Sequence, residues 1–178
     1  MRLQAALVAI ALCLFAHVTY AQPSHSHVPS ADDVVAATRA TAAFQDVAVA
    51  EAAGYANTVE ALGCFHNPEH GGMGLHYLRE ALLDDQLNVE TPEALVYELG
   101  PGGEVVSLVA HEYVVPVAAW TSEEPPRIFG MDLHRHNVLP LWVMHTWLWK
   151  DNPAGFFEDY NPAVRLCPEG VKLFGAGG

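Results

Sequence analysis

The segment EALVYELGPGGEVVSLVAHEYVV, residues 93–115, carries the clearest structural signal in this sequence. Two runs rich in β-branched and aromatic residues, 93–99 and 104–115, flank the turn-forming sequence Gly-Pro-Gly-Gly. This pattern predicts a β-hairpin with a four-residue loop. Further along the chain, LWVMHTWLWK, residues 141–150, has a similar composition and predicts a third strand.

Upstream of the hairpin, residues 31–53 have the periodicity of an amphipathic helix. Ser30 and Asp33 have the spacing of an N-terminal capping box, and Gly54 suits the position just after a last helical turn. We therefore predict an α+β fold in which this long N-terminal helix packs on an antiparallel β-sheet. The side chains that recur at spacings of three and four are Val34, Ala37, Thr41, Phe44, Ala48, Ala52 and Tyr55.

Length and composition restrict the class of protein. The chain has 178 residues, 51% of them hydrophobic, which suits a single globular domain, predicted over residues 30–178. It contains 8 Lys and Arg residues and 21 Asp and Glu residues, which gives a formal net charge of −13. Such an acidic chain has no basic stripe with which to contact phosphates, so we expect no nucleic-acid partner.

The first residues have the pattern of an export signal. Arg2 precedes an apolar run over residues 3–15, and small residues lead up to Ala21. This predicts a signal peptide over residues 1–21, followed by a flexible tail over residues 22–29. The apolar run is shorter than the ~20 residues that a membrane span needs. We therefore expect a secreted or periplasmic protein with no stable membrane insertion after cleavage.

Two cysteines remain after the predicted cleavage, Cys64 and Cys167. In an exported chain the simplest interpretation is one disulfide bond. Neither cysteine has a CxxC partner, which disfavours the alternative, a pair of metal-binding thiolates.

Two polar residues interrupt apolar rows on the predicted strands. Glu112 is the exception on one face of residues 104–115, and His145 is the exception on one face of the third strand, because side chains alternate between faces. A buried carboxylate is costly unless it is paired or bound to a metal. If the strands share a sheet, Glu112 and His145 are neighbours, and the glycine-rich stretch before His76 can bring that residue to them. The apolar neighbours of Glu112 on its face are Val106, Leu108, Ala110 and Val114.

These three residues, His76, Glu112 and His145, predict a divalent-metal site with an open coordination position. Two neutral imidazoles and a carboxylate suit Zn, Cu, Mn or Fe. The expected partner is then a metal ion or a small-molecule ligand. A buried Glu–His ion pair is the alternative, and the sequence leaves open whether the protein is an enzyme.

The other histidines are weaker candidates for metal ligands. His66 and His70 lie in a glycine-flanked segment beside Cys64, and His134 and His136 are one residue apart. Either pair is a candidate contributor. His111 alternates to the face opposite Glu112, so we expect a surface residue or a support for a ligand.

A second functional class is a non-catalytic exported binding module. In this class the Glu–His pair is structural and an aromatic face contacts the ligand. The aromatic side chains that can form such a face are Trp142, Trp147, Trp149, Phe156, Phe157 and Tyr160.

Two long motifs, GGMGLHY at residues 71–77 and HTWLWKDNPAG at residues 145–155, occur together with Glu112, Tyr113 and Pro116. In this combination the chain resembles a family of uncharacterised small exported bacterial proteins with GGMGxHY and HxWxWxxNPxG motifs. The resemblance implies no activity. It implies that His76, Glu112 and His145 belong to one recurrent set, and that Cys64 and Cys167 belong to it too.

Overall fold

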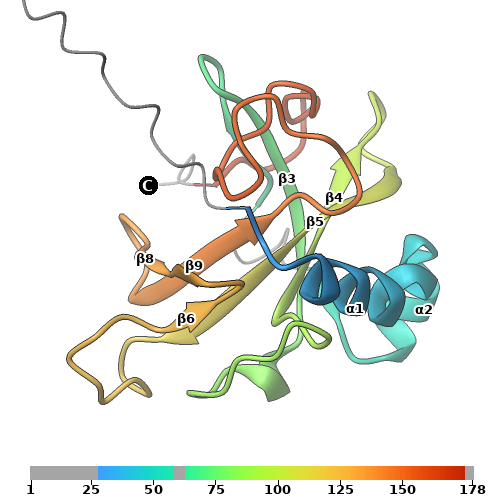
Figure 1. The fold of residues 1–178 in the computed structure, drawn as a ribbon. Helices are drawn as coiled ribbons and strands as arrows, with labels where there is room; N and C mark the ends of the chain where they lie inside the picture. The colour runs from blue at the N-terminus through green and yellow to red at the C-terminus, as the bar shows by residue number, and fades with distance from the viewer. Residues whose placement is uncertain (1–27, 58–62, 175–178) are drawn as a thin grey trace, which may run out of the picture.

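The dominant element of the protein is an antiparallel β-sheet (Figure 1). The computed structural model describes residues 28–57 and 63–174. Within this part, seven strands form one sheet in the order β1-β3-β4-β5-β9-β8, and β2 pairs with β3 beside that path. The strands are β1 (Ala56–Asn57), β2 (Phe65–Asn67), β3 (Gly71–Leu78), β4 (Ala94–Leu99), β5 (Val105–Pro116), β8 (His134–Arg135) and β9 (Leu141–Thr146). Apart from the N-terminal helical segment, the other elements of this region are the small ribbon of β6 (Arg127–Ile128) with β7 (Met131–Asp132), and the 3-10 helix η2 (Glu80–Leu82).

The hairpin predicted from residues 93–115 is confirmed. It consists of β4 and β5, which pair antiparallel across the Gly-Pro-Gly-Gly turn. The third predicted strand is confirmed as β9, although it ends at Thr146 rather than at residue 150. β9 pairs antiparallel with β5, so the two strands that carry Glu112 and His145 are direct neighbours.

Side-chain alternation along β5 is broken by an irregularity in its pairing with β4. Val96 pairs with Ala110, but the next residue of β4, Tyr97, pairs with Leu108. Leu108 therefore packs with Tyr97 in one core cluster, whereas Ala110 packs with Val96 in another. The prediction that one apolar row surrounds Glu112 is therefore wrong for Leu108, because a bulge moves this side chain to the other face of the sheet.

The predicted α+β fold built on one long N-terminal helix is wrong. The protein is mainly antiparallel sheet, and its N-terminal segment forms three short pieces. They are α1 (Ala31–Thr41), the 3-10 helix η1 (Ala42–Gln45) and α2 (Val47–Ala52). Figure 1 shows α1 and α2 as separate coils rather than one continuous helix.

Asp46 is the physical reason for the break. Its backbone is extended, with φ −88° and ψ 110°, and its side chain accepts a hydrogen bond from the N–H of Ala48. This is an N-cap, so a new helix begins where the apolar periodicity predicted continuation. The new helix start changes which face of the helix is buried. Ala50 is fully buried, whereas Ala48, which was predicted to lie on the buried face, is exposed. Ser30 makes no side-chain capping bond at the start of α1.

The helical segment packs against the sheet face opposite the Glu112 side chain. Ala50 and Tyr55 pack with Leu95 and Tyr97 of β4. The Tyr97 hydroxyl also donates a hydrogen bond of 2.6 Å to the carbonyl of Phe44. With one face covered in this way, the other face of the same strands is available for a pocket.

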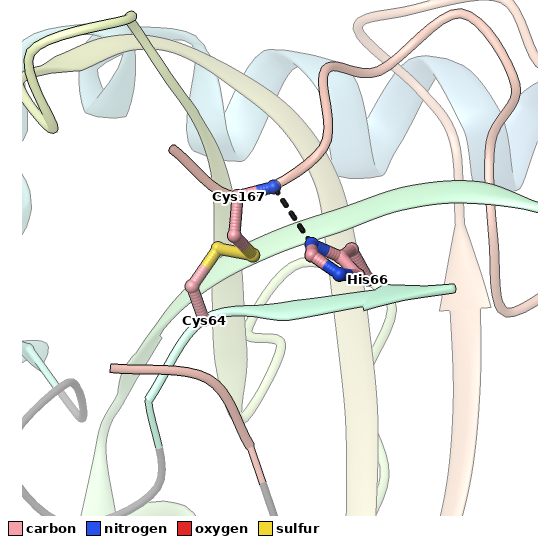
Figure 2. The surroundings of a disulfide bond; sticks show 3 residues. All are labelled: Cys64, His66 and Cys167. Carbon is pink, nitrogen blue, oxygen red and sulfur yellow. Dashed lines mark hydrogen bonds between the residues drawn. A yellow bond between two sulfur atoms is a disulfide. The ribbon is translucent and has the colours of Figure 1, made fainter. Parts of the chain in front are cut away.

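The disulfide predicted between Cys64 and Cys167 is confirmed (Figure 2). It joins residues 103 apart in the sequence and connects the segment before β2 to the C-terminal region. His66 lies beside it, where its Nδ1 accepts a hydrogen bond of 3.0 Å from the N–H of Cys167. Both cysteines are bonded to each other, so the alternative of metal-binding thiolates is wrong.

The predicted signal peptide, residues 1–21, and most of the predicted tail lie outside the described residues. Among the helices that the structure describes, none is both long enough and apolar enough to cross a membrane.

Candidate metal centre

Glu112 and His145 lie directly opposite each other on β5 and β9. The next residue pairs on either side, His111 with Thr146 and Tyr113 with Met144, direct their side chains to the other face. His145 is 1% exposed at its side chain, and Glu112 is 12% exposed. The neighbour relationship predicted from alternation is therefore confirmed, and both polar groups lie in an environment with little water.

His76 reaches the pair from β3, two strands away from β5. The glycines that precede His76 belong to β3 itself. Gly74 has φ +116°, and a Cβ there would lie 2.6 Å from the carbonyl oxygen of Tyr97. The glycines thus allow close approach of the backbones, rather than flexibility, and this packing places His76. Its ring packs edge-on against Phe65, with a centroid distance of 4.7 Å.

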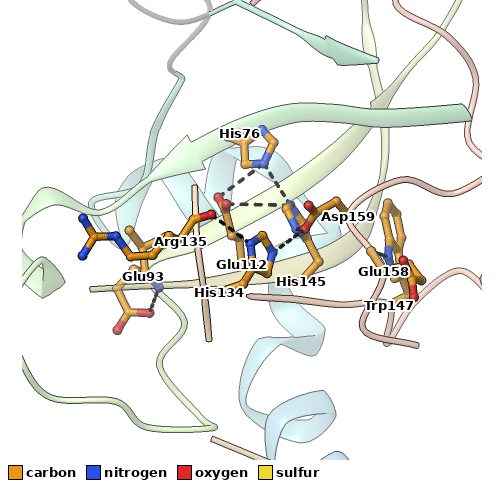
Figure 3. A network of polar contacts seen from close by, with 10 residues as sticks. His76, Glu93, Glu112, His134, Arg135, His145, Trp147, Glu158 and Asp159 are labelled. Atoms are coloured by element: carbon orange, nitrogen blue, oxygen red, sulfur yellow. Dashed lines mark hydrogen bonds and ion pairs between the residues drawn. The ribbon is translucent and has the colours of Figure 1, made fainter. Parts of the chain in front are cut away.

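The three side chains converge on one point (Figure 3). The Nε2 atom of His76 lies 3.4 Å from Nε2 of His145 and 3.4 Å from Oε2 of Glu112. Nε2 of His145 lies 3.9 Å from Oε1 of Glu112. Two donors at 2.0–2.1 Å from a tetrahedral ion are about 3.3 Å apart. A small inward adjustment therefore suffices for all three residues to bind one divalent ion.

Asp159 determines which nitrogen of His145 faces this point. Its Oδ1 accepts hydrogen bonds from Nδ1 of His145 at 3.2 Å and from Nε2 of His134 at 3.0 Å. When Nδ1 of His145 donates this bond, the Nε2 atom of the neutral form of the ring carries a lone pair, which faces the Glu112 carboxylate. Two acceptors facing each other repel unless a proton or a cation lies between them.

The segment with Asp159 is held by contacts that no sequence pattern indicates. The indole N–H of Trp147 donates a 2.6 Å hydrogen bond to the carbonyl of Glu158. The backbone N–H of Asn161, which is fully buried, donates to the carbonyl of Gly72 on β3. These contacts join the C-terminal segment to Gly72 of β3 and to Trp147, which directly follows β9. Sequence reasoning missed Asp159, because adjacent acids in an irregular segment have no periodicity that separates them from solvated charge.

Burial determines the charge states in the metal-free site. It lowers the pKa of His76 to about 3, and the nearby His145 adds to the effect. Burial also raises the pKa of Glu112, against the opposing influence of His145. Burial disfavours the ionised form of Asp159, but hydrogen bonds from His134 and His145 outweigh it and hold this pKa well below its usual range. His76 is therefore a neutral imidazole at physiological pH, which is the form that binds metals.

A pocket of about 230 Å³ opens over the three residues. Its polar lining beyond them consists of His134, His136, Asn137 and Asp159, together with Tyr160. The rest of its wall is apolar, contributed by Phe65, Met73, Leu78, Leu83, Ala94, Val114, Val138, Leu139, Leu141, Val143 and Phe174. An ion bound by three protein ligands here would keep a coordination position directed into this space.

The other histidines have different roles. His134 contacts Asp159 rather than the point of convergence, and His136 lines the pocket while its Nδ1 accepts hydrogen bonds from the N–H groups of Val138 and Leu139. His66 supports the disulfide, and His70 stacks on Tyr160. None of these four belongs to the cluster of potential ligands.

His111 lies on the opposite face of β5, as predicted, but it is not a surface residue. It is fully buried, and burial lowers its pKa to about 3. Its ring nitrogens lack hydrogen-bond partners among the described residues.

No protein-family model, curated protein or solved structure matches this chain. The resemblance of its two motifs to small exported bacterial proteins therefore stays a prediction. The function has to be inferred from the site itself.

Proposed function

We propose that this protein is an exported protein that binds one divalent metal ion through His76, Glu112 and His145. The observation that carries the proposal is the convergence of two imidazole nitrogens and the two oxygens of one carboxylate, at separations of 3.4–3.9 Å. Zn and Fe(II) suit this ligand set best, and Cu and Mn remain candidates for it. The pocket supplies room for a substrate beside the ion, which supports a metal-dependent enzyme as the finer form of the proposal.

The alternative, a buried Glu–His ion pair, accounts for less of the geometry. An ion pair needs one histidine, whereas two present their Nε2 atoms to Glu112. The low pKa of His76, caused first by burial, also opposes the protonated form that an ion pair requires. A metal ion satisfies both imidazoles and the carboxylate at once.

The aromatic face of a non-catalytic binding module has less support. Trp147 is 3% exposed and packs with Val96, whereas Trp149 packs against a different core cluster. Trp142 and Phe157 pack against a third cluster. These rings pack against three different core clusters instead of forming one continuous binding surface.

The test of metal binding is a titration of untagged mature protein with Zn, Cu, Mn and Fe(II), followed by elemental analysis. We expect one ion per chain. Glu112→Gln keeps the shape of the side chain but removes its charge, so metal affinity should fall at least tenfold while the circular-dichroism spectrum is unchanged. Glu104→Gln, at an exposed position before β5, is the matched control and should bind as the wild type does.

His76→Ala and His145→Ala should each have a similar effect, and the double variant should lose little more, because removing one of three ligands already opens the site. His70→Ala is the control for both. If the wild-type protein binds none of the four metals at micromolar concentration, the metal proposal is wrong and the buried ion pair takes its place.

Export is supported by the predicted signal peptide and by the Cys64–Cys167 disulfide, which forms in oxidising compartments. Mass spectrometry of protein secreted by a bacterial host should find a mature N-terminus at Gln22. An intact N-terminus on protein that remains in the cytoplasm would contradict export.

A further inference from the structure

We propose that the metal centre binds a small amphiphilic monoanion, whose simplest form is a medium-chain carboxylate. Its head group would bind the ion and its hydrocarbon chain would occupy the apolar pocket. This inference rests on the proposed metal binding, because the pocket lining that the structure describes contains no lysine or arginine.

An apolar floor begins immediately beside the metal ligands. Val114 and Val143 lie directly opposite each other on β5 and β9, two residues from Glu112 and His145. Alternation places both valines on the same face as the ligands, about 7 Å further along the strands. Both are buried and both line the pocket. A chain attached to a metal-bound head group would therefore lie on hydrocarbon from its first carbons onward.

Ala94 makes room for such a chain above β4. It pairs with Glu112 on one side and with Leu78 on the other, so it lies between the metal centre and the next apolar residue across the sheet. Its methyl group leaves space that a larger side chain would fill. Leu83 and Leu139 form further parts of the apolar wall.

The charges of the site favour a single negative charge on the ligand. A divalent ion keeps one uncompensated positive charge when the groups bound directly to it are Glu112 and two neutral imidazoles. Among the described lining residues, the one other carboxylate is Asp159, which is already hydrogen-bonded to His134 and His145. A monoanion would neutralise the ion at low dielectric, whereas a dianion would bring an unpaired charge into an apolar pocket.

The size of the pocket sets the length of the chain. An apolar cavity of roughly 150 Å³ holds a benzene molecule, with its six ring carbons. On the same scale, 230 Å³ accommodates about nine non-hydrogen atoms, the size of heptanoate. This is below the range of about 300–1,000 Å³ that drug-sized ligands occupy.

The test is isothermal titration calorimetry of the metal-loaded protein with heptanoate, acetate and 1-heptanol. We expect heptanoate to bind at least tenfold more tightly than acetate, which lacks the chain, and than heptanol, which lacks the charge. Metal-free protein should bind heptanoate at least tenfold more weakly. Less than a tenfold preference in any of these comparisons would overturn the inference. Protein that loads metal but shows no preference contradicts only this inference, whereas protein that loads no metal contradicts the proposed function as well.

A pair of valine variants on one strand locates the chain. Val114→Phe fills the floor of the pocket and should weaken heptanoate binding at least tenfold, while acetate and metal binding are unchanged. Val106→Phe introduces the same ring at a position that is 54% exposed and does not line the pocket, so it should have no effect. Wild-type affinity for heptanoate in folded Val114→Phe would contradict the assigned position. The wild-type comparisons decide the matter if that variant does not fold.

Discussion

Asp159 accepts a hydrogen bond of 3.2 Å from Nδ1 of His145, so the opposite nitrogen of the same ring faces Glu112. A carboxylate behind a metal-binding histidine fixes its tautomer and orientation and raises its basicity. The same Oδ1 atom also accepts from His134, which connects the buried imidazole to a half-exposed one on β8.

Asp159→Ala should weaken metal binding by about 10–100-fold, which is typical of losing a residue that orients a ligand. The ring of His145 would then have no partner that selects Nε2 as the lone-pair nitrogen. His134→Ala should cause a smaller loss, because Asp159 keeps its bond to His145. Competition titration with a metal-binding dye measures both, and Asp151→Ala, at an exposed position earlier in the same C-terminal region, is the control. Equal affinities in Asp159→Ala and wild type would show that Asp159 has no such role.

Gly74→Ala should destabilise the protein much more than Gly170→Ala. Both glycines have positive φ, +116° and +82°, so both substitutions add backbone strain. At Gly74 the new Cβ would also lie 2.6 Å from the carbonyl oxygen of Tyr97, whereas at Gly170 nothing lies within 4 Å. We expect the free energy of unfolding, from urea denaturation, to fall by at least about 2 kcal/mol more for Gly74→Ala. Equal losses would contradict the close approach of β3 and β4.

Glu93 should make stability depend on pH. It is 1% exposed, its Oε2 accepts a hydrogen bond from the N–H of Val114, and burial raises its pKa from 4.5 to about 8. Between these values the folded chain keeps a proton that the unfolded chain releases. The free energy of unfolding should therefore fall as pH rises from about 5 to 8, by at most about 1.4 kcal/mol per pH unit.

Glu93→Gln removes this titration while its amide oxygen can still accept from Val114. Urea denaturation of metal-free protein at pH 5, 6.5 and 8 isolates the effect, since other titrating groups cancel in the difference between the two proteins. The stability of the wild type relative to Glu93→Gln should decline with rising pH. A constant difference would mean that Glu93 ionises near its ordinary pKa in the folded protein.

Removal of the disulfide should cost stability without removing a metal ligand. Cys64 and Cys167 close a loop across 103 positions, for which the chain-entropy model gives about 4–5 kcal/mol. Neither should react with a thiol reagent in the native protein until it is reduced. The Cys64→Ala, Cys167→Ala double variant should have a lower urea midpoint and, where it remains folded, near wild-type metal affinity. Two reactive thiols in the oxidised protein would contradict the bond.

Local alternation in the sequence was enough to predict β4, β5 and β9 and the proximity of Glu112 to His145. This succeeds because the two-residue period of a strand assigns each side chain to a face before any partner is known. It failed before the bulge in β5, where one extra residue moved Leu108 to the other face. The helical periodicity also failed to predict the N-terminal segment correctly, because the capping preference of Asp46 outweighed the apolar pattern around it.

Tertiary structure alone decided the rest of the site. His76 lies on β3, whose glycines permit close contact with the backbone of β4. Its position therefore depends on β4 as well as on its own segment. Asp159 lies in an irregular segment with no period to interpret, and the bonds that place it run from Trp147 to Glu158 and from Asn161 to Gly72. Sequence patterns report local geometry, whereas a carboxylate placed by contacts across more than eighty residues can be recognised only when the chain has folded around it.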